Sequence, residues 1–307
     1  MAGKELRELL GPVTPAEFLS KYWAKRTLHL KGERRRFAKL FDKRRFWKAL
    51  DTLDAQGAEG RGVIRAHWGR MKPDDGSAGP FTFVTAKHAR VALKKGASLC
   101  VNVISDGDRG LNELCAAVKR QLGYPGLVRF NAYYSPHEGG LPVHFDARVA
   151  WVMQLSGSKK WWFTEKPVVD WPRVNADRND DGSADYVDGA RPEAWEQARP
   201  SGTGDFKHVV LEPGDCLIMP AGVWHLAEAE HESLALTLCF DPVAPLAVLY
   251  EQLDAEVRSS PQWRASEPSM SGGKVLAERA RELATQLEQL AKDEKRLEAV
   301  WRALTGG

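Results

Sequence analysis

The chain has 307 residues, of which 43% are hydrophobic and 28% are charged, and its formal net charge is +3. This composition is typical of a folded globular protein and excludes the disordered and fibrous classes. A net charge this small gives no strong signal for nucleic-acid binding, although basic residues cluster at 31–36 and 43–45. The cluster has two interpretations, a solvated helix face or a docking patch for an acidic partner, and the first is favoured.

The four cysteines are scattered through the chain and include no CxxC pair. Such spacing in a chain of this length argues against a disulfide framework and against a thiolate zinc site. No signal peptide and no run of about eighteen apolar residues is visible, so we expect no membrane span. These features predict a protein of the reducing cytoplasm.

The first part of the chain, residues 1–125, is predicted to be a helical and mixed region that packs on a core. Thr14, Pro15 and Glu17 form a capping box, and apolar residues follow at helical spacing. A second amphipathic helix is predicted over 37–53. A third is predicted over 111–123, where a glycine ends it.

From residue 127 the pattern changes to short β-branched or aromatic runs separated by glycine and proline. This pattern predicts antiparallel strands that form a sandwich or barrel core over 126–242. The predicted strands are 127–134, 150–155, 160–164, 208–211, 216–219 and 234–240.

A polar stretch at about 167–204 interrupts the strands and is predicted to be an inserted surface loop. Within it, residues 177–188 match an EF-hand calcium loop at six positions of the pattern. Asp188 replaces the bidentate glutamate, Ala184 replaces the apolar anchor, and no clear helices flank the loop. An acidic solvated loop is therefore favoured over a calcium site.

The last segment, 243–307, is predicted to be helical. Leucines recur there every seven residues, a spacing that favours a left-handed helix–helix contact. The partner is either the same helix in a second copy, which we favour, or this protein's own body. The repeat consists of Leu276, Leu283, Leu290, Leu297 and Leu304.

Three residues are candidates for a metal site. His144 and Asp146 lie two positions apart at the start of an apolar strand, so both side chains can converge on one ion. His225 follows two turns and a short strand at the point where the chain re-enters the sheet. Two histidines and one carboxylate that leave three coordination positions open are the facial triad of non-haem iron(II) oxygenases.

Lys159 begins the next predicted strand, after a turn at Gly157. A hairpin at that turn would bring Lys159 alongside the metal-bearing strand. A buried ammonium needs an anionic partner, and the distal carboxylate of 2-oxoglutarate supplies one. Without the triad, Lys159 and Lys160 would be interpreted as solvated hairpin residues.

The chain resembles the JmjC-type, cupin-fold oxygenases, and most closely their bacterial and nucleolar ribosomal oxygenase branch. The resemblance covers roughly residues 12–245, and about 65 residues follow it, too few for both the helical dimerisation region and the winged-helix domain of that branch. The resemblance therefore leaves open whether a ribosomal protein is the substrate. The resemblance rests on 131–136, 140–146, 154–161 and 213–225.

The resemblance implies a double-stranded β-helix (jelly-roll) core with iron(II), 2-oxoglutarate as co-substrate, and dioxygen. His144, Asp146 and His225 take the positions of the iron ligands. Lys159 takes the position that pairs with the distal carboxylate of 2-oxoglutarate, and Tyr133 lines the co-substrate pocket.

The resulting functional hypothesis is hydroxylation of an aliphatic carbon on a protein or peptide side chain. Hydroxylation of a free amino acid or a natural-product intermediate is the rival within the enzyme class. Demethylation of methylated lysine is less favoured, because this branch resembles hydroxylases. A non-catalytic, metal-binding cupin sensor is the alternative from another class.

Overall fold

The computed structural model describes residues 3–57, 63–67, 81–179, 181–187, 205–264 and 272–306. The chain divides into two compact units. The first comprises residues 1–122 and 127–241, and the second comprises residues 123–126 and 242–307.

The first unit contains two antiparallel sheets. The larger has eight strands in the order β1 (Leu28–Leu30), β12 (Cys216–Met219), β7 (Val149–Ser156), β14 (Ser233–Asp241), β5 (Leu127–Ser135), β4 (Ser98–Val101), β2 (Ile64–His67) and β3 (Phe81–Phe83). The smaller has six strands in the order β10 (Ala184–Tyr186), β9 (Ala176–Arg178), β6 (Gly140–Phe145), β13 (His225–Ala229), β8 (Lys159–Thr164) and β11 (Phe206–Leu211). The predicted jelly-roll core is confirmed.

The two sheets pack face to face around an apolar core. Val152, Leu217 and Ala235 come from the large sheet, and Trp161 and Phe163 come from the small one. Their burial removes apolar surface from water, which is the main stabilising contribution to such a sandwich.

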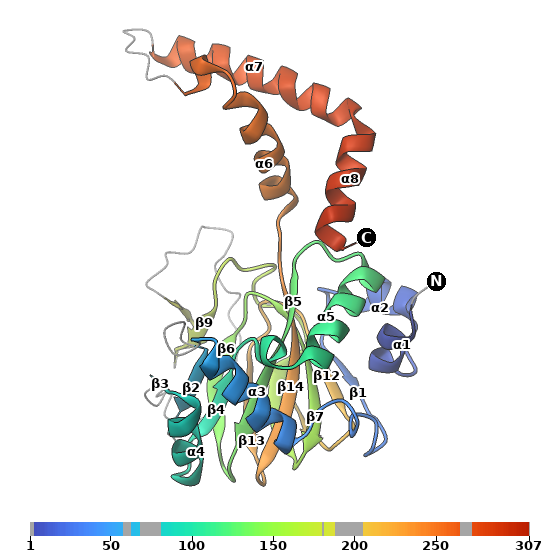
Figure 1. The fold of residues 1–307 in the computed structure, drawn as a ribbon, viewed down its shortest axis with the longest axis vertical. Coiled ribbons are helices and arrows are strands. Elements are labelled where there is room, and N and C mark those ends of the chain that lie inside the picture. Colours follow the sequence, from blue (N-terminus) through green and yellow to red (C-terminus); the bar gives the residue numbers. More distant parts are fainter. Residues whose placement is uncertain are drawn as a thin grey trace. The chain divides into compact units, whose positions relative to one another are not determined.

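Helices cover the outer face of the large sheet (Figure 1). Phe18 packs edge-on against Trp151 of β7, with ring centroids 5.1 Å apart, and Phe46 packs against Tyr134 of β5 at 5.4 Å. Both contacts bury aromatic area and use the favoured T-shaped geometry. The helices of this unit are α1 (Lys4–Leu10), α2 (Pro15–Lys21), α3 (Lys43–Ala55), α4 (Ala86–Lys94) and α5 (Arg109–Leu122), with a 3₁₀ turn, η2 (Ile104–Gly107), before α5.

The predicted helix ends are confirmed in two cases and wrong in one. The Thr14 side chain accepts a hydrogen bond from the backbone N–H of Glu17 at 3.2 Å, as the capping box requires. Gly123 follows α5 with a φ of +60°, which suits glycine. The second helix begins at Lys43 and not at 37, because the Asp42 carboxylate accepts a hydrogen bond from the N–H of Arg45 at 2.7 Å and caps the helix there.

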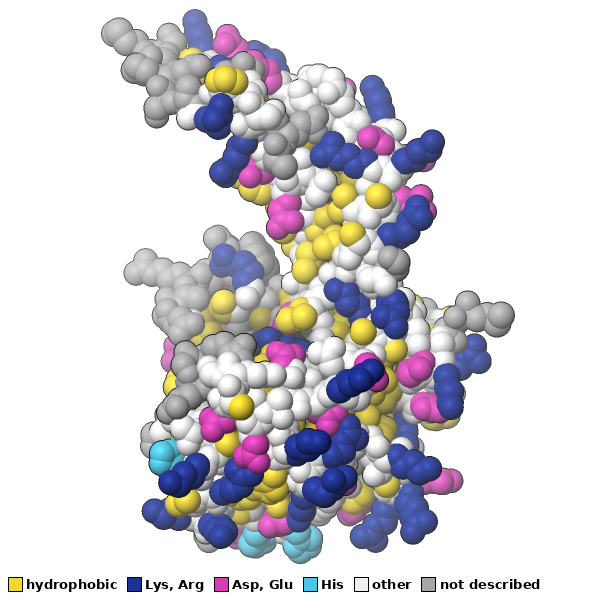
Figure 2. Space-filling model, viewed as in Figure 1, with side chains coloured by type: hydrophobic (Ala, Val, Ile, Leu, Met, Phe, Trp, Pro, Cys, Tyr) yellow, Lys and Arg dark blue, Asp and Glu magenta, His cyan; other side chains and the backbone are white. Residues whose placement is uncertain are grey.

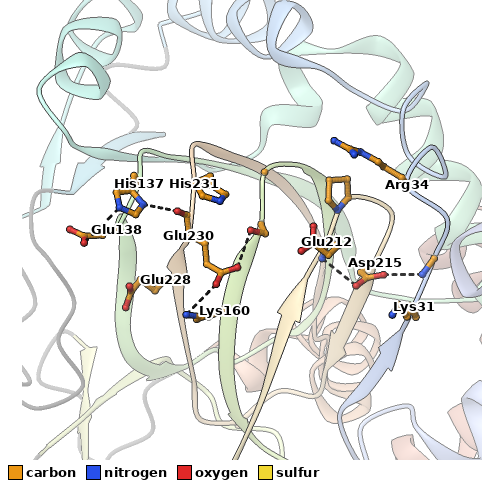
Figure 3. Close-up of a pocket in the computed structure, with 14 residues that line it drawn as sticks. Lys31, Arg34, His137, Glu138, Lys160, Glu212, Asp215, Glu228, Glu230 and His231 are labelled. Atoms are coloured by element: carbon orange, nitrogen blue, oxygen red, sulfur yellow. Dashed lines mark hydrogen bonds and ion pairs between the residues drawn. The ribbon is translucent and has the colours of Figure 1, made fainter.

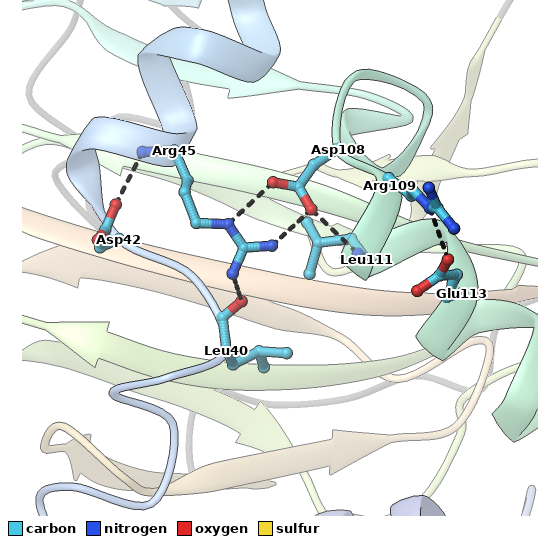
Figure 4. A network of polar contacts seen from close by, with 7 residues as sticks. All are labelled: Leu40, Asp42, Arg45, Asp108, Arg109, Leu111 and Glu113. Carbon is cyan, nitrogen blue, oxygen red and sulfur yellow. Dashed lines mark hydrogen bonds and ion pairs between the residues drawn. The ribbon is translucent and has the colours of Figure 1, made fainter.

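Three members of the basic cluster have structural partners, one of them Lys43, which pairs with Glu232. Arg36 donates hydrogen bonds to the carbonyls of Glu8 and Leu9 and so caps the C-terminus of α1. The guanidinium of Arg45 binds the Asp108 carboxylate at 2.5 and 2.9 Å and joins α3 to the start of α5 (Figure 4). Figure 2 shows the remaining Lys and Arg side chains of this face interspersed with acidic and apolar ones.

The hairpin predicted between residues 150–155 and 160–164 is wrong. β7 pairs with β12 and β14 in the large sheet, whereas β8 pairs with β11 and β13 in the small sheet. The chain therefore crosses from one sheet to the other at Gly157, where φ is +64° and an added Cβ would lie 2.2 Å from the carbonyl oxygen of Glu232. Glycine is required there, since a side chain has neither the backbone conformation nor the space.

The second unit is helical. The leucine repeat does not lie on one continuous helix, because the Asp293 side chain accepts a hydrogen bond from the N–H of Arg296 at 3.0 Å and caps a new helix there. Its helices are α6 (Pro245–Val257), α7 (Gly272–Lys292) and α8 (Glu294–Thr305), with a 3₁₀ turn, η6 (Pro261–Trp263), after α6.

Two expectations drawn from composition can be compared with the described residues. The cysteines Cys100, Cys115, Cys216 and Cys239 are all free, and the last three are buried. Within the described ranges, no helix combines the length and the apolar character that crossing a membrane requires.

Candidate metal and co-substrate site

His144 and His225 lie directly opposite each other on neighbouring antiparallel strands, β6 and β13. Their ring centroids are 4.3 Å apart. The strand pairing shifts register between His225 and Ala227, and β-bulges of this kind re-aim side chains next to functional sites.

Asp146 follows β6 and completes the group. One ligand atom from each of His144, Asp146 and His225 lies within 4.8 Å of the others. The side-chain amide of Asn175 donates a hydrogen bond to Asp146 Oδ1 at 2.8 Å, and the Asn175 oxygen accepts one from the N–H of Ala147 at 2.8 Å. Asn175 therefore fixes both the carboxylate and the backbone beside it.

The second sequence motif is joined to the first through Gly222. Its N–H donates to the carbonyl oxygen of Asp146 at 2.9 Å. Gly222 has a φ of +77°, and an added Cβ would lie 1.9 Å from the carbonyl oxygen of Val169. Only glycine satisfies both conditions, which explains the Ala-Gly turn three residues before His225.

Both imidazoles are held in one tautomer. His144 Nδ1 lies 2.7 Å from the carbonyl oxygen of Pro142, and His225 Nδ1 lies 2.9 Å from that of Val223. Because a carbonyl oxygen only accepts hydrogen bonds, each Nδ1 carries the proton and each Nε2 keeps its lone pair. Such backbone partners orient metal-binding histidines.

Burial, together with the neighbouring His144, lowers the pKa of His225 to about 4, although Asp146 acts in the opposite direction. Burial alone would raise the pKa of Asp146, but His144, His225 and nearby Arg148 outweigh burial and lower it. At neutral pH the site therefore presents a neutral imidazole and a carboxylate, the forms that bind metal ions.

These residues fit a divalent transition-metal ion. Metal–ligand bonds to histidine nitrogen and carboxylate oxygen measure about 2.0–2.2 Å, so a single ion can reach donor atoms that lie this close together. The donor set has mixed nitrogen and oxygen chemistry on one side of the ion, which is the arrangement that non-haem iron(II) centres use.

Lys159 lies in the same cavity as the three candidate ligands. Its side chain is buried, with 4% of its surface exposed, and Nζ donates a hydrogen bond to Ser135 Oγ at 2.9 Å. The Tyr133 ring lies 5.9 Å from Nζ. Burial lowers the pKa of Lys159 to about 8, because the ammonium has lost water without gaining a carboxylate in the described part of the protein.

Alternate residues of β5 lie beside the cavity of Lys159 and beside a second, wider cavity next to it. Ser135 and Tyr133 lie beside Lys159, whereas Asn131 and Arg129 line a wider outer cavity of about 430 Å³. Tyr133 borders both spaces, as do two of the candidate ligands, His144 and Asp146. The metal position therefore lies between a small lysine-bearing cavity and a larger polar one.

A more open hollow of about 710 Å³ lies elsewhere on this unit (Figure 3). Two of its charged side chains pair with each other, since Lys160 lies 3.1 Å from Glu230, and Asp215 accepts a hydrogen bond from the backbone N–H of Gly32. None of the five predicted site residues lines it. It is therefore not the candidate site.

The segment that matches the calcium motif, within the predicted surface loop, forms a β-hairpin in its described part. The described residues of 177–188 form the β9–β10 hairpin, in which Asp177 lies opposite Asp185. β9 pairs with β6, so that Asp177 also lies opposite His144. An EF-hand loop connects two helices instead. Asp180 and Asp188 lie outside the described residues, as does 188–204 of the insertion.

All five predicted site residues thus line one connected region, but several partners were missed. Ser135 could have been found, because it continues the alternation of Asn131 and Tyr133 on one face of a strand. Asn175 carries no such signal, since it lies in an irregular segment of the polar insertion. Arg65 lies on a short strand that the sequence did not predict.

Comparison with known proteins agrees with this geometry. The JmjC domain family matches residues 112–245. The YxbC protein of Bacillus subtilis (strain 168) is 26% identical over 262 residues, covering 84% of this chain and 77% of that protein. The bifunctional lysine-specific demethylase and histidyl-hydroxylase NO66 of Drosophila grimshawi is 27% identical over 260 residues, covering 81% of this chain. This chain spans 32% of the length of that NO66 protein.

Solved structures share the fold. YcfD, a ribosomal oxygenase from Escherichia coli, in complex with cobalt and 2-oxoglutarate has a TM-score of 0.55 at 15% identity. The match covers 96% of this chain and 71% of that one. The complex of YcfD with cobalt and succinic acid gives a TM-score of 0.54 at 16% identity, with the same coverage.

Proposed function

We propose that this protein, whose residues 112–245 match the JmjC domain family, is an iron(II)- and 2-oxoglutarate-dependent oxygenase that hydroxylates an aliphatic carbon of a protein or peptide side chain. The observation that carries the proposal is the position of Lys159. A buried ammonium lies in the same cavity as His144, Asp146 and His225, where a dicarboxylate bound at the metal would neutralise it.

Each residue has a role in this scheme. His144, Asp146 and His225 would hold iron(II), the metal whose non-haem oxygenase centres use two histidines and one carboxylate. Iron(II), 2-oxoglutarate and dioxygen together supply the oxidising power, while the protein supplies binding and orientation. Lys159 and Ser135 bind the distal carboxylate of 2-oxoglutarate.

Apolar side chains around Lys159 exclude water from the co-substrate. Val152, Met219 and Ala235 line this cavity, and each is almost fully buried. A dry, low-dielectric cavity strengthens the attraction between the ammonium and a carboxylate. It also protects the reaction from competing hydrolysis and proton leakage.

The relatives differ in the activities that their names state. NO66 is named as a lysine-specific demethylase and a histidyl-hydroxylase, and YcfD is named as a ribosomal oxygenase. Because this chain spans about a third of the length of the NO66 proteins, the substrate cannot be transferred from them. The rival is a free amino acid or natural-product intermediate, since an outer cavity of about 430 Å³ suits a single side chain or a small molecule. A metal-binding cupin sensor is the non-enzymatic alternative.

The test is formation of succinate from 2-oxoglutarate by the purified full chain with iron(II) in air. We expect succinate in the wild-type protein and none above background after His144→Ala. Cell extract, separated into protein and small-molecule fractions, then distinguishes the substrates by mass spectrometry: the fraction that gains one oxygen atom contains the substrate. Metal binding without succinate formation would identify a sensor instead.

We also propose that the second unit forms a homodimer. Leu276 and Leu283 of the repeat keep 72% and 38% of their surface exposed on α7. Replacing both with glutamate in the full chain should halve the mass measured by light scattering. Leu246→Glu, a change on α6 outside the repeat at a leucine that is 77% exposed, serves as the control; an unchanged mass in the double variant refutes the proposal.

A further inference from the structure

We propose that the outer cavity binds a carboxylate group of the substrate and that Arg65 is its principal partner. This inference rests on the proposed function, because it concerns the substrate side of the same site. The proposed function leaves the charge of the substrate unspecified, whereas this inference assigns the substrate a negatively charged group.

Three arginines from the large sheet line the outer cavity: Arg65 of β2, Arg129 of β5, and Arg148, which immediately precedes β7. Arg129 and Arg148 share one carboxylate, that of Asp241, at 2.9 and 3.3 Å. Their Nε atoms, like that of Arg65, are buried and have no hydrogen-bond partner among the described residues.

Arg65 differs from the other two because no ion pair neutralises it within the described part of the chain. Its contact there is with an aromatic ring, that of Phe83, at 5.4 Å. A half-buried guanidinium with an unsatisfied donor is costly unless an acceptor reaches it. An anionic group of a bound molecule would supply the missing acceptor.

The strand register places Arg65 at the level of the metal site. Arg65 pairs with Cys100 of β4, and Cys100 pairs with Tyr133 of β5. Neighbouring strands are about 4.8 Å apart, so Arg65 lies two strand spacings, about 10 Å, from Tyr133 along this row. A molecule anchored at Arg65 can therefore present a carbon atom near the metal position.

Charge balance favours an anion over a cation. In the loaded site the charges of iron(II), Asp146, 2-oxoglutarate and Lys159 cancel. In the outer cavity, three arginines face the carboxylate of Asp241 and that of Asp177, which lines the wall formed by the small sheet. Among the described residues of this cavity, one positive charge stays uncompensated, and a guanidinium pairs best with a carboxylate through its planar fork.

The carboxylate can be an aspartyl or glutamyl side chain of a peptide, or the α-carboxylate of a free amino acid. Three probes separate these sources. N-acetyl-aspartate amide carries only a side-chain carboxylate, free asparagine carries an α-carboxylate, and N-acetyl-asparagine amide is neutral. N-acetyl-arginine amide serves as the cationic comparison.

The experiment is calorimetric titration of each probe into the full chain loaded with manganese(II) and saturating 2-oxoglutarate under nitrogen. We expect one of the two carboxylate probes to bind at least tenfold more tightly than the neutral and cationic probes. Arg65→Gln should remove this preference, and Arg65→Lys, which keeps the charge but not the fork, should retain part of it. Arg34→Gln, an exposed arginine outside the cavity, should leave binding unchanged.

Equal binding of the neutral or cationic probe, or unchanged binding in a folded Arg65→Gln variant, overturns the inference. If Arg65→Gln lowers the melting temperature, the Arg65→Lys variant tests the inference in its place, and it should retain part of the preference for the carboxylate probe. A failure of the proposed function is separately visible, because 2-oxoglutarate would then not bind. The probes are also titrated into the metal-free Lys159→Ala variant, which lacks the ammonium that would bind a carboxylate in the lysine cavity. The preference of the outer cavity for anions is therefore measured whether or not 2-oxoglutarate binds.

Discussion

His144 and His225 occupy paired positions on β6 and β13, although they are far apart in the chain, and their ring centroids are 4.3 Å apart. Each ring is oriented by a backbone carbonyl two residues before it in the chain. The small sheet therefore determines both the separation of the two imidazoles and the nitrogen that each presents to an ion.

Loss of one imidazole should abolish metal binding. We expect His144→Ala to reduce the affinity for iron(II) or manganese(II) by at least about a hundredfold, because two ligands cannot complete the facial arrangement. Calorimetric titration with manganese(II) measures this. The matched control is His208→Ala, an exposed histidine on β11 of the same sheet; equal loss in both variants would argue against a specific site.

Asn175 should affect the metal site without contacting the ion. Asn175→Ala removes the hydrogen bonds to Asp146 and to the N–H of Ala147. Loss of such supporting partners typically weakens metal affinity about 10–100-fold, and we expect an effect in that range at an unchanged melting temperature. Asn112→Ala, an exposed change on α5, should have no effect. Unchanged metal affinity in Asn175→Ala would show that Asp146 does not depend on this partner.

Lys159 and its neighbour Lys160 form a natural pair of variants. Lys159 is buried in the cavity, whereas Lys160 points to the other side of the strand and pairs with Glu230. Lys159→Ala should raise the 2-oxoglutarate concentration needed for half-maximal succinate formation at least about tenfold, because a buried charged hydrogen bond is lost. Metal binding should persist. Lys160→Ala should behave like the wild type, and an equal effect of both changes would contradict the assignment.

The 2-oxoglutarate affinity should fall as the pH rises above about 8. Burial lowers the pKa of Lys159 to about 8 in the free protein, and a bound carboxylate raises it again. Above pH 8 the free protein thus loses the ammonium that the complex requires, and binding weakens by up to about tenfold per pH unit. Titrations at several pH values measure the slope, and Lys159→Arg, which stays charged, should remove it.

The same shift has an opposite consequence for folding. Between pH 8 and pH 10.5, the unfolded chain keeps the Lys159 proton that the folded free protein releases. Stability of the free protein should therefore gain from Lys159 as the pH rises through this window. Comparing the free energy of unfolding of wild type and Lys159→Met across this range isolates the contribution; a falling difference would contradict the sign.

Comparing substitutions at two glycines distinguishes the cost of a left-handed backbone conformation from the cost of a steric clash. Gly222 and Gly57 both have positive φ, +77° and +76°, but an added Cβ meets the Val169 carbonyl at Gly222 and nothing within 4 Å at Gly57. Gly57→Ala should cost about 1–2 kcal/mol of unfolding free energy from the left-handed conformation alone. Gly222→Ala should cost at least about 2 kcal/mol more, because the chain must shift beside Asp146. Denaturant unfolding of both variants measures the difference, and equal costs would refute the close approach.

Local patterns in the sequence predicted a sandwich or barrel, most strands of its core and the candidate metal ligands, whereas the jelly-roll class and the role of Tyr133 came from the resemblance to JmjC-type oxygenases. The predicted strands and metal ligands rest on local signals, which can be recognised without a structure: alternation of period two, turn residues at fixed places and the His-x-Asp spacing. The start of α3 was missed because a local cap at Asp42 begins the helix there, although buried aromatic residues lie on both sides of it.

Only the tertiary structure decided how these parts meet. The crossing of the chain between sheets at Gly157, the support of Asp146 by Asn175, and the alignment of Arg65 with Tyr133 all depend on contacts between distant segments. Strand order and register are set by how two whole sheets bury their apolar faces against each other, and no local pattern encodes that choice. For this reason the candidate metal ligands could be proposed from the sequence, whereas the three arginines of the outer cavity could not be grouped without the structure.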